Sequence, residues 1–235
     1  MANVSVNDLT PNERIASLVG VSVVLLVPAY LSAHDLGLSL VKTTDPAAMV
    51  INEFAIWSVV LALLAIVVCW ERNPITSIGI GRPSWEAICL GVLCTAPLLV
   101  LSMGTGALLR MLGAPAGDNA QAGMILGLPL WLQFFVAVTA GFTEEILFRG
   151  YAIERVTLLT GSRKLGGIIP ILIFGAVHAP FWGLAHAVIA GSTGFWLTLI
   201  YLWRRNLWVN IVAHGLLDAV LFVAIDINAA HQVTG

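Results

Sequence analysis

The chain has 235 residues, of which 59% are hydrophobic and only 10% are charged, with a formal net charge of −2. A soluble domain usually carries about 25% charged residues, because its surface has to face water. Charge this sparse leaves lipid as the solvent for much of the surface and predicts an integral membrane protein. No basic run of the kind that binds nucleic acid is present, so we expect no nucleic-acid partner.

Apolar segments recur along the whole chain and predict an all-α fold, a polytopic transmembrane helical bundle formed by one domain over residues 1–235. The expected spans number about seven, within a range of six to eight: 15–33, 50–70, 87–109, 124–148, 166–178, 186–203 and 207–224. As one helix, residues 166–203 would be about 57 Å long, which is too long for one crossing. Pro180 is the expected break, because proline removes a backbone donor and clashes with the preceding turn.

Basic residues are unevenly distributed between the connecting segments, and cytoplasmic segments are the ones that carry an excess of Lys and Arg. With seven spans and the N-terminus inside, the outer segments hold only Lys42 and Arg110. The inner segments hold the other nine, Arg14, Arg72, Arg82, Arg149, Arg155, Arg163, Lys164, Arg204 and Arg205. We therefore expect the N-terminus inside and the C-terminus outside. The compact size and the absence of sorting signals favour a bacterial cytoplasmic membrane.

The fourth expected span ends in F-T-E-E-I-L-F-R-G, where Glu144 and Glu145 are adjacent. Ionisable groups inside a membrane are costly, so each of them needs a reason. In a helix, Glu145 and Arg149 share a face and can pair, whereas Glu144 is rotated by about 100° from its neighbour. We expect Arg149 to neutralise Glu145 and to leave Glu144 free as a general base. Alternatively, both glutamates merely end the helix in the headgroup region.

Two later helices carry imidazole groups at a similar depth. His178 lies near the end of one, and Asn210, His214 and Asp218 form a stripe at every fourth position of the other. A carboxylate one turn from a histidine commonly fixes its tautomer and orientation, although a structural hydrogen-bond network between helices would look the same. Counted from the arginine-rich ends, Glu144, His178 and His214 lie roughly 13–21 Å along their helices. We expect them to meet around one cytosol-facing polar cavity.

Two other ionisable residues within apolar segments belong to none of these patterns. Glu53 is expected to extend its carboxylate toward the outer face of the membrane. His186 is interpreted as a structural or interfacial residue.

These motifs resemble those of the CPBP family, the CAAX proteases and bacteriocin-processing enzymes also called the Abi family. The family pattern is E-E-x-x-x-R, then F-x-x-x-H, then H-x-x-x-N/D. It corresponds here to Glu144, Glu145 and Arg149, to Phe174 and His178, and to His214 and Asp218. The stretch I-G-I-G-R-P-S-W is similar to the family's usual lead-in, so the resemblance covers roughly residues 77–220.

The resemblance implies an intramembrane endopeptidase of the metalloprotease or glutamic type. Its substrate would be a membrane-associated or lipidated protein or peptide. By the same resemblance, Glu144 would be the general base, His178 would help to hold the water, and His214 would stabilise the tetrahedral oxyanion. Many members carry Asn where this chain has Asp218. An ionised carboxylate cannot donate to an oxyanion, so we expect Asp218 to orient His214.

Several aspects of the chemistry stay open. The polar stripes contain no serine or cysteine near a base, so we expect direct attack by water without an acyl-enzyme. Glu144, His178 and His214 could instead bind zinc, with Glu145 as base, but the spacing is not H-E-x-x-H and does not establish a metal. Two non-enzymatic interpretations also remain: a proton or ion pathway, and a catalytically idle immunity or partner-binding protein. The expected partners are a peptide or protein substrate and the lipid bilayer.

Overall fold

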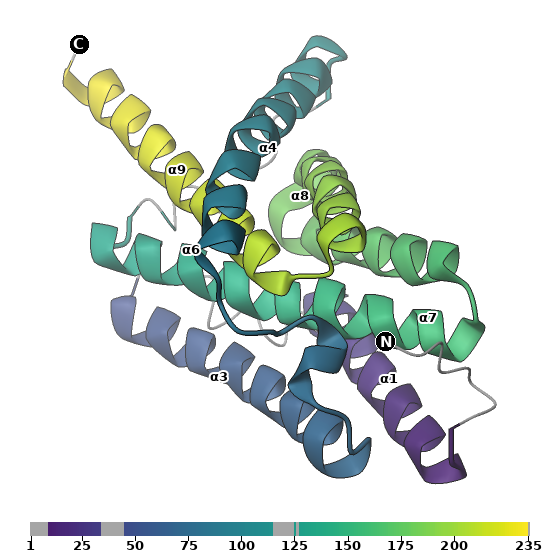
Figure 1. Ribbon diagram of the computed structural model, residues 1–235. Coiled ribbons are helices and arrows are strands. Elements are labelled where there is room, and N and C mark those ends of the chain that lie inside the picture. The colour runs from purple at the N-terminus through teal and green to yellow at the C-terminus, as the bar shows by residue number, and fades with distance from the viewer. Residues whose placement is uncertain (1–8, 34–44, 115–124, 126, 235) are drawn as a thin grey trace.

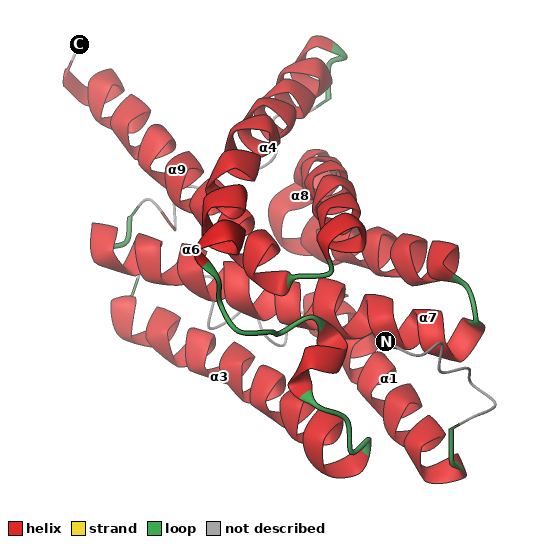
Figure 2. Ribbon diagram, viewed as in Figure 1, coloured by secondary structure: helices red, strands yellow, loops and turns green. Residues whose placement is uncertain are grey.

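The computed structural model of the chain describes residues 9–33, 45–114, 125 and 127–234, with side chains described except at 29–33, 181 and 224–234 (Figure 1). These residues form helices joined by loops, without strands, which confirms the predicted all-α fold (Figure 2). In chain order the helical elements are α1 (Pro11–Ala33), α3 (Pro46–Ala65), η2 (Ile66–Trp70), η3 (Ile75–Ile78), α4 (Trp85–Met111), α6 (Leu130–Glu144), η4 (Glu145–Ala152), α7 (Ile153–Thr160), α8 (Arg163–Arg204) and α9 (Leu207–Thr234).

Local sequence signals explain several helix boundaries. At the start of α1, the Thr10 hydroxyl accepts the backbone N–H of Glu13, and the Glu13 carboxylate accepts the backbone N–H of Thr10. This reciprocal pair satisfies two amide donors that have no partner within the helix. The Asp45 side chain caps α3 in a similar way by accepting from Ala47. Helix α7 ends at Gly161, whose φ of 66° is left-handed and therefore suits a residue without a Cβ atom.

Helix α8 breaks at a glycine rather than at the expected proline. Pro180 lies inside the helix, whereas Gly183 has φ 83° and ψ 165°, well outside helical geometry. The predicted position was therefore wrong by three residues. Proline is held near a φ of about −65°, so only the glycine can adopt the positive φ that the kink requires. The kink divides α8 into two arms, the first carrying His178 and the second carrying His186.

Five described helical segments are long and apolar enough to cross a membrane: Pro11–Pro28, Pro46–Trp70, Trp85–Met111, Leu130–Thr160 and Trp182–Arg204. The first arm of α8 and the shorter apolar segment Leu207–Val223 correspond to the other two expected spans. The count of seven and the orientation of the termini stay predictions. Large apolar side chains on the outside of the bundle, such as Phe54, Leu93 and Val100, are exposed as lipid-facing groups would be. These features are those of an integral membrane protein.

Helix α9 packs along both α4 and α6, and Figure 1 shows α4 and α9 diverging toward the top of the view. Two glycines meet where α6 contacts α9. A Cβ atom on Gly141 would lie 2.8 Å from the backbone nitrogen of Gly215. Small residues allow two backbones to approach in this way. The close approach brings His214, next to Gly215 on α9, against the C-terminal end of α6, where the paired glutamates lie.

At the arginine-rich end of the bundle, Glu71 is fully buried and holds three elements together. Its carboxylate accepts hydrogen bonds from the hydroxyls of Ser17 at 3.0 Å and Tyr151 at 2.7 Å. It also accepts two from the guanidinium of Arg155, at 2.9 and 2.7 Å. Because every one of these partners is buried, the network joins the start of α1 to η4 and α7.

Candidate active site

Glu145 is the most heavily bonded polar side chain of the site and is fully buried. One carboxylate oxygen, Oε1, accepts from Nη1 of Arg149 at 2.6 Å and faces Nδ1 of His214 at 2.8 Å. The other oxygen, Oε2, accepts from Nδ2 of Asn210 at 3.1 Å. The predicted pairing of Glu145 with Arg149 is therefore present. The contacts of Glu145 with Asn210 and His214 join η4 to α9 beside the contact of Gly141 with Gly215.

Glu144 has a different environment, although it is the adjacent residue. Its side chain retains 30% exposure, and its Oε2 lies 3.8 Å from Nε2 of His214. The last α-helical turn of α6 ends at Glu144, and the wider π-helix η4 starts at Glu145. Such π-helical insertions are frequent at functional sites, because they change the direction in which successive side chains point. Here Glu145 points into the protein, and Glu144 points into a cavity.

Each of the two ring nitrogens of His214 faces at least one carboxylate. Nδ1 faces Glu145 at 2.8 Å, whereas Nε2 lies 3.6 Å from Oδ2 of Asp218 and 3.8 Å from Glu144. The expectation that Asp218 orients His214 stays a prediction. Hydrogen-bonding distance is reached only on the Glu145 side of the ring, and Asp218 stands on its cavity side.

His178 is held by its own helix. Its Nδ1 lies 2.6 Å from the carbonyl oxygen of Phe174, and a carbonyl can only accept, so Nδ1 carries the proton. Nε2 is thereby left as an acceptor on the cavity side. The Phe174 ring contacts both imidazoles, with centroids 4.8 Å from His178 and 6.4 Å from His214. Arg149 stacks on the same ring, with its Cζ atom 4.2 Å from the centroid.

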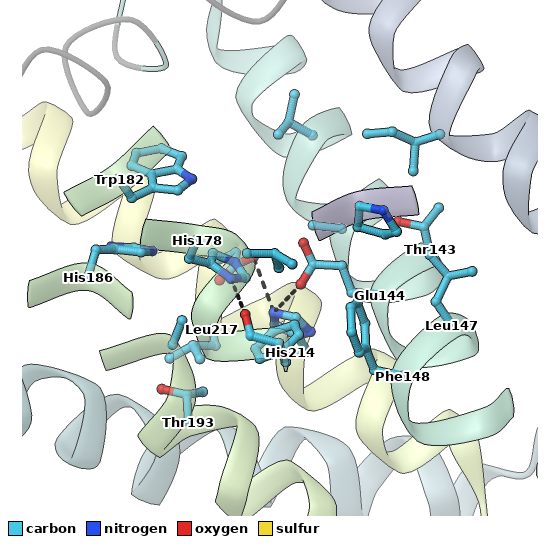
Figure 3. Close-up of a pocket in the computed structure, with 18 of the residues that line it drawn as sticks. Thr143, Glu144, Leu147, Phe148, His178, Trp182, His186, Thr193, His214 and Leu217 are labelled. Carbon is cyan, nitrogen blue, oxygen red and sulfur yellow. Dashed lines mark hydrogen bonds and ion pairs between the residues drawn. The ribbon is translucent and has the colours of Figure 1, made fainter. Parts of the chain in front are cut away.

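Glu144, His178, His214 and Asp218 line one cavity of about 440 Å³. Figure 3 shows Glu144 and His214 facing each other, with His178 beside His214 and the stacked Trp182 and His186 beyond it. The structure thus brings together the residues that the sequence selected on three separate helices. Most of the remaining lining is apolar, as is typical of sites that bind an organic ligand.

The cavity lies away from the arginine-rich end of the bundle. On α9 its lining begins at His214 and ends at Phe222, about 10–22 Å from the start of the helix at Leu207. Toward the arginine-rich end, the described part of the bundle is filled by fully buried side chains, among them Ile78, Tyr151 and Leu207. With the N-terminus inside, this packing does not support the predicted opening toward the cytosol.

Two cavity residues were missed as site residues by the sequence analysis. Glu53 of α3 was expected to reach the outer face, but its residue is only 4% exposed and lines the cavity. His186 was left as structural, yet its ring lies 5.7 Å from that of His178, and it also lines the cavity. An ionisable group inside an apolar segment was the available signal for both. The packing partner of each helix was the missing information.

The positions of the side chains bear on whether Glu144, His178 and His214 could bind zinc. Within the described part of the chain, no three His, Cys, Asp or Glu side chains are grouped so that they could hold a metal ion. The set Glu144, His178 and His214 therefore does not fit a zinc site in this arrangement. The zinc interpretation stays a prediction.

Comparison with known proteins supports the family resemblance. Residues 126–220 match the family described as type II CAAX prenyl endopeptidase Rce1-like. The uncharacterized protein YpbD of Bacillus subtilis (strain 168) is 38% identical over 89 residues, which are 37% of this chain and 41% of that protein. This chain thus matches less than half of the relative's length. No solved structure matches the chain.

The matched region contains the paired glutamates and both histidine motifs. It begins after α4, so the lead-in near residue 77 lies outside it, and the predicted extent of 77–220 stays a prediction. Residues 126–220 match the Rce1-like family, as the motifs predicted.

Proposed function

We propose that this protein is an intramembrane endopeptidase in which Glu144 and His178 activate a water molecule for attack on a peptide bond. One observation carries the proposal: catalytic-type side chains from α6, α8 and α9 line a single, mainly apolar cavity. Glu145 is unsuited to be the base, because Arg149, Asn210 and His214 already occupy its oxygens. Glu144 retains free oxygen positions on the cavity side.

The water would lie between the Glu144 carboxylate and Nε2 of His178, both of which can accept a hydrogen bond from it. Glu144 takes one proton as the water oxygen attacks the carbonyl carbon. The proton then passes to the leaving nitrogen as the carbon–nitrogen bond breaks. The products are a carboxylic acid and an amine, and Glu144 returns to its starting form.

His214 stands where negative charge develops on the carbonyl oxygen. When it is protonated on both nitrogens, it would donate Nδ1–H to Glu145 and Nε2–H to the oxyanion. Asp218, 3.6 Å from Nε2, would balance the charge of the ring and would not itself donate. A donor already held in place costs no reorganisation when the oxyanion forms. Glu145 and Arg149 would therefore act as positioning residues.

The test uses the purified full chain in lipid nanodiscs with a library of peptides, the cleavage products being identified by mass spectrometry. We expect Glu144→Gln to lower turnover by about 10²- to 10⁴-fold, the usual contribution of a general base. A matched control is Glu86→Gln, which changes an exposed carboxylate in the first turn of α4 and should leave turnover unchanged. Unaltered cleavage by folded Glu144→Gln protein would refute the mechanism.

The same variant separates the enzyme from its alternatives. If the protein is an idle partner-binding protein, Glu144→Gln should retain its biological effect in cells. If it is a proton or ion pathway, proteoliposomes should show a flux that the variant abolishes, without any peptide cleavage. A peptidase loses cleavage and shows no such flux.

A further inference from the structure

A third carboxylate faces the proposed active site from outside the family-like domain. Glu53 belongs to α3, whereas the match to the family begins at residue 126. One turn before Glu53, Met49 packs against Leu128 and Leu132 beside the start of α6. Residues four apart share a helical face, so Glu53 is held on the α6 side of α3. Its side chain lines the cavity and interacts electrostatically with Glu144.

The cavity wall combines three carboxylates with three imidazoles, and it carries an excess of negative charge when His214 is the protonated one. Glu53, Glu144 and Asp218 are acidic, while the described residues of the wall include no lysine or arginine. The guanidinium of Arg149 stacks on Phe174 and pairs with Glu145, outside the cavity wall. The His214 ring, positive in the proposed mechanism, lies beside Glu144 and Asp218, at 3.8 and 3.6 Å. The three carboxylates still outnumber it, and no lysine or arginine among the described wall residues faces Glu53.

Placing these carboxylates around one cavity costs free energy unless a positive group compensates their charge. A buried carboxylate loses its hydration, and two that face one cavity repel each other. A positive group placed between Glu53 and Glu144 would remove the repulsion and supply the missing partner. A negative group in the same place would add to the repulsion.

We propose that Glu53 is a specificity-determining residue that binds a positively charged group of the substrate close to the scissile bond. The group is an ammonium or a guanidinium, from a Lys or Arg side chain or from a free amino terminus. This inference rests on the proposed function.

The experiment compares peptides that differ at a single position next to the bond that the wild-type protein cleaves. That position carries lysine, arginine, norleucine or glutamate, and each peptide is made with a free and an acetylated amino terminus. We expect lysine and arginine peptides to be preferred over norleucine by about 10- to 100-fold in kcat/KM, the value of one charge-assisted hydrogen bond. If the cation is instead the free amino terminus, we expect peptides with a free terminus to be preferred over their acetylated forms.

Glu53→Gln should abolish this preference, so that its kcat/KM values for the lysine, arginine and norleucine peptides lie within about threefold of one another. Glu53→Asp should restore part of it, and Glu53→Lys should shift the preference to the glutamate peptide. Glu86→Gln serves as the control, since it removes an exposed carboxylate outside the cavity. Equal loss for all peptides in Glu53→Gln, or a wild-type protein that prefers neutral or acidic peptides, would overturn the proposal.

Binding separates this proposal from the proposed function. Fluorescently labelled lysine and norleucine peptides are titrated against Glu144→Gln protein, with and without Glu53→Gln, and anisotropy is measured. Tighter binding of the lysine peptide that depends on Glu53 supports the cation site even if no variant cleaves anything. Equal binding of both peptides overturns it even if the wild-type protein is an active peptidase.

Discussion

Nδ1 of His214 lies 2.8 Å from Oε1 of Glu145, and the same oxygen receives Nη1 of Arg149 at 2.6 Å. The second glutamate of the E-E pair thus serves as the centre of a buried charge network. Glu144, the first glutamate of the pair, faces the cavity. This division predicts different consequences for the two neighbouring positions.

Glu145→Gln should destabilise the protein by about 3–5 kcal/mol, because it leaves the buried guanidinium of Arg149 without a counter-charge. Glu144→Gln should change stability by less than about 1 kcal/mol, because its side chain is partly exposed and makes no close ion pair. Reversible unfolding in mixed detergent micelles measures both. Equal effects at the two positions would contradict the assignment of separate roles.

The Glu71 network is expected to matter for stability alone. Glu71→Ala leaves the buried Arg155 unpaired and should cost about 3–5 kcal/mol. The network lies at the arginine-rich end, outside the cavity wall, so kcat per folded molecule should stay within about twofold of wild type. Tyr151→Phe is the milder comparison, since it removes a single 2.7 Å hydrogen bond and should cost about 1 kcal/mol. A large loss of kcat in folded Glu71→Ala protein would show that the two ends are coupled.

The sequence was sufficient for the helical class and for the main members of the site. Charge inside an apolar segment is costly, so Glu144, His178 and His214 were conspicuous without a structure. Their depth along separate helices could be counted from the arginine-rich ends. The pairing of Glu145 with Arg149 followed from their spacing and is present at 2.6 Å.

The contacts between distant segments were not available from such patterns. Glu71 and Arg155 are 84 positions apart, and nothing local marks them as partners. Glu53 could not be placed in the cavity without knowing that α3 packs beside α6. The spacing of His214 and Asp218 did not reveal the carboxylate nearest to the ring, because Glu145 from another helix comes closer than Asp218 on the same helix.

The contact of α6 with α9 gives a test of the packing that carries His214. Gly141→Ala would place a Cβ atom 2.8 Å from the backbone of Gly215, which cannot move aside as a side chain could. We expect a loss of stability of about 1–3 kcal/mol and a fall in turnover, because the helix that carries His214 is displaced. Gly104→Ala is the control. Its Cβ atom would meet nothing within 4 Å, so it should be neutral or slightly stabilising.

Metal removal should leave the activity intact. Because the described His, Cys, Asp and Glu side chains form no group that could hold a metal ion, the proposed water attack uses protein groups alone. We expect turnover to be unchanged after dialysis against a strong chelator, with the metal content checked by elemental analysis. Loss of turnover that added zinc restores would establish the metalloprotease interpretation and would require the site to rearrange.

The position of the cavity predicts the side of the membrane from which it is reached. His186 lines the cavity, while Arg204 is exposed at the arginine-rich end, which we expect to face the cytosol. After Cys69, Cys89 and Cys94 are replaced by alanine, a single cysteine is introduced by His186→Cys or Arg204→Cys. A membrane-impermeant maleimide added to intact cells should label the former and not the latter, which should react only after the cells are opened. The close packing of the described residues between the site and the arginine-rich end is the physical reason for this expectation. The reverse labelling pattern would place the cavity opening on the cytosolic side and would invert the orientation predicted from the charge distribution.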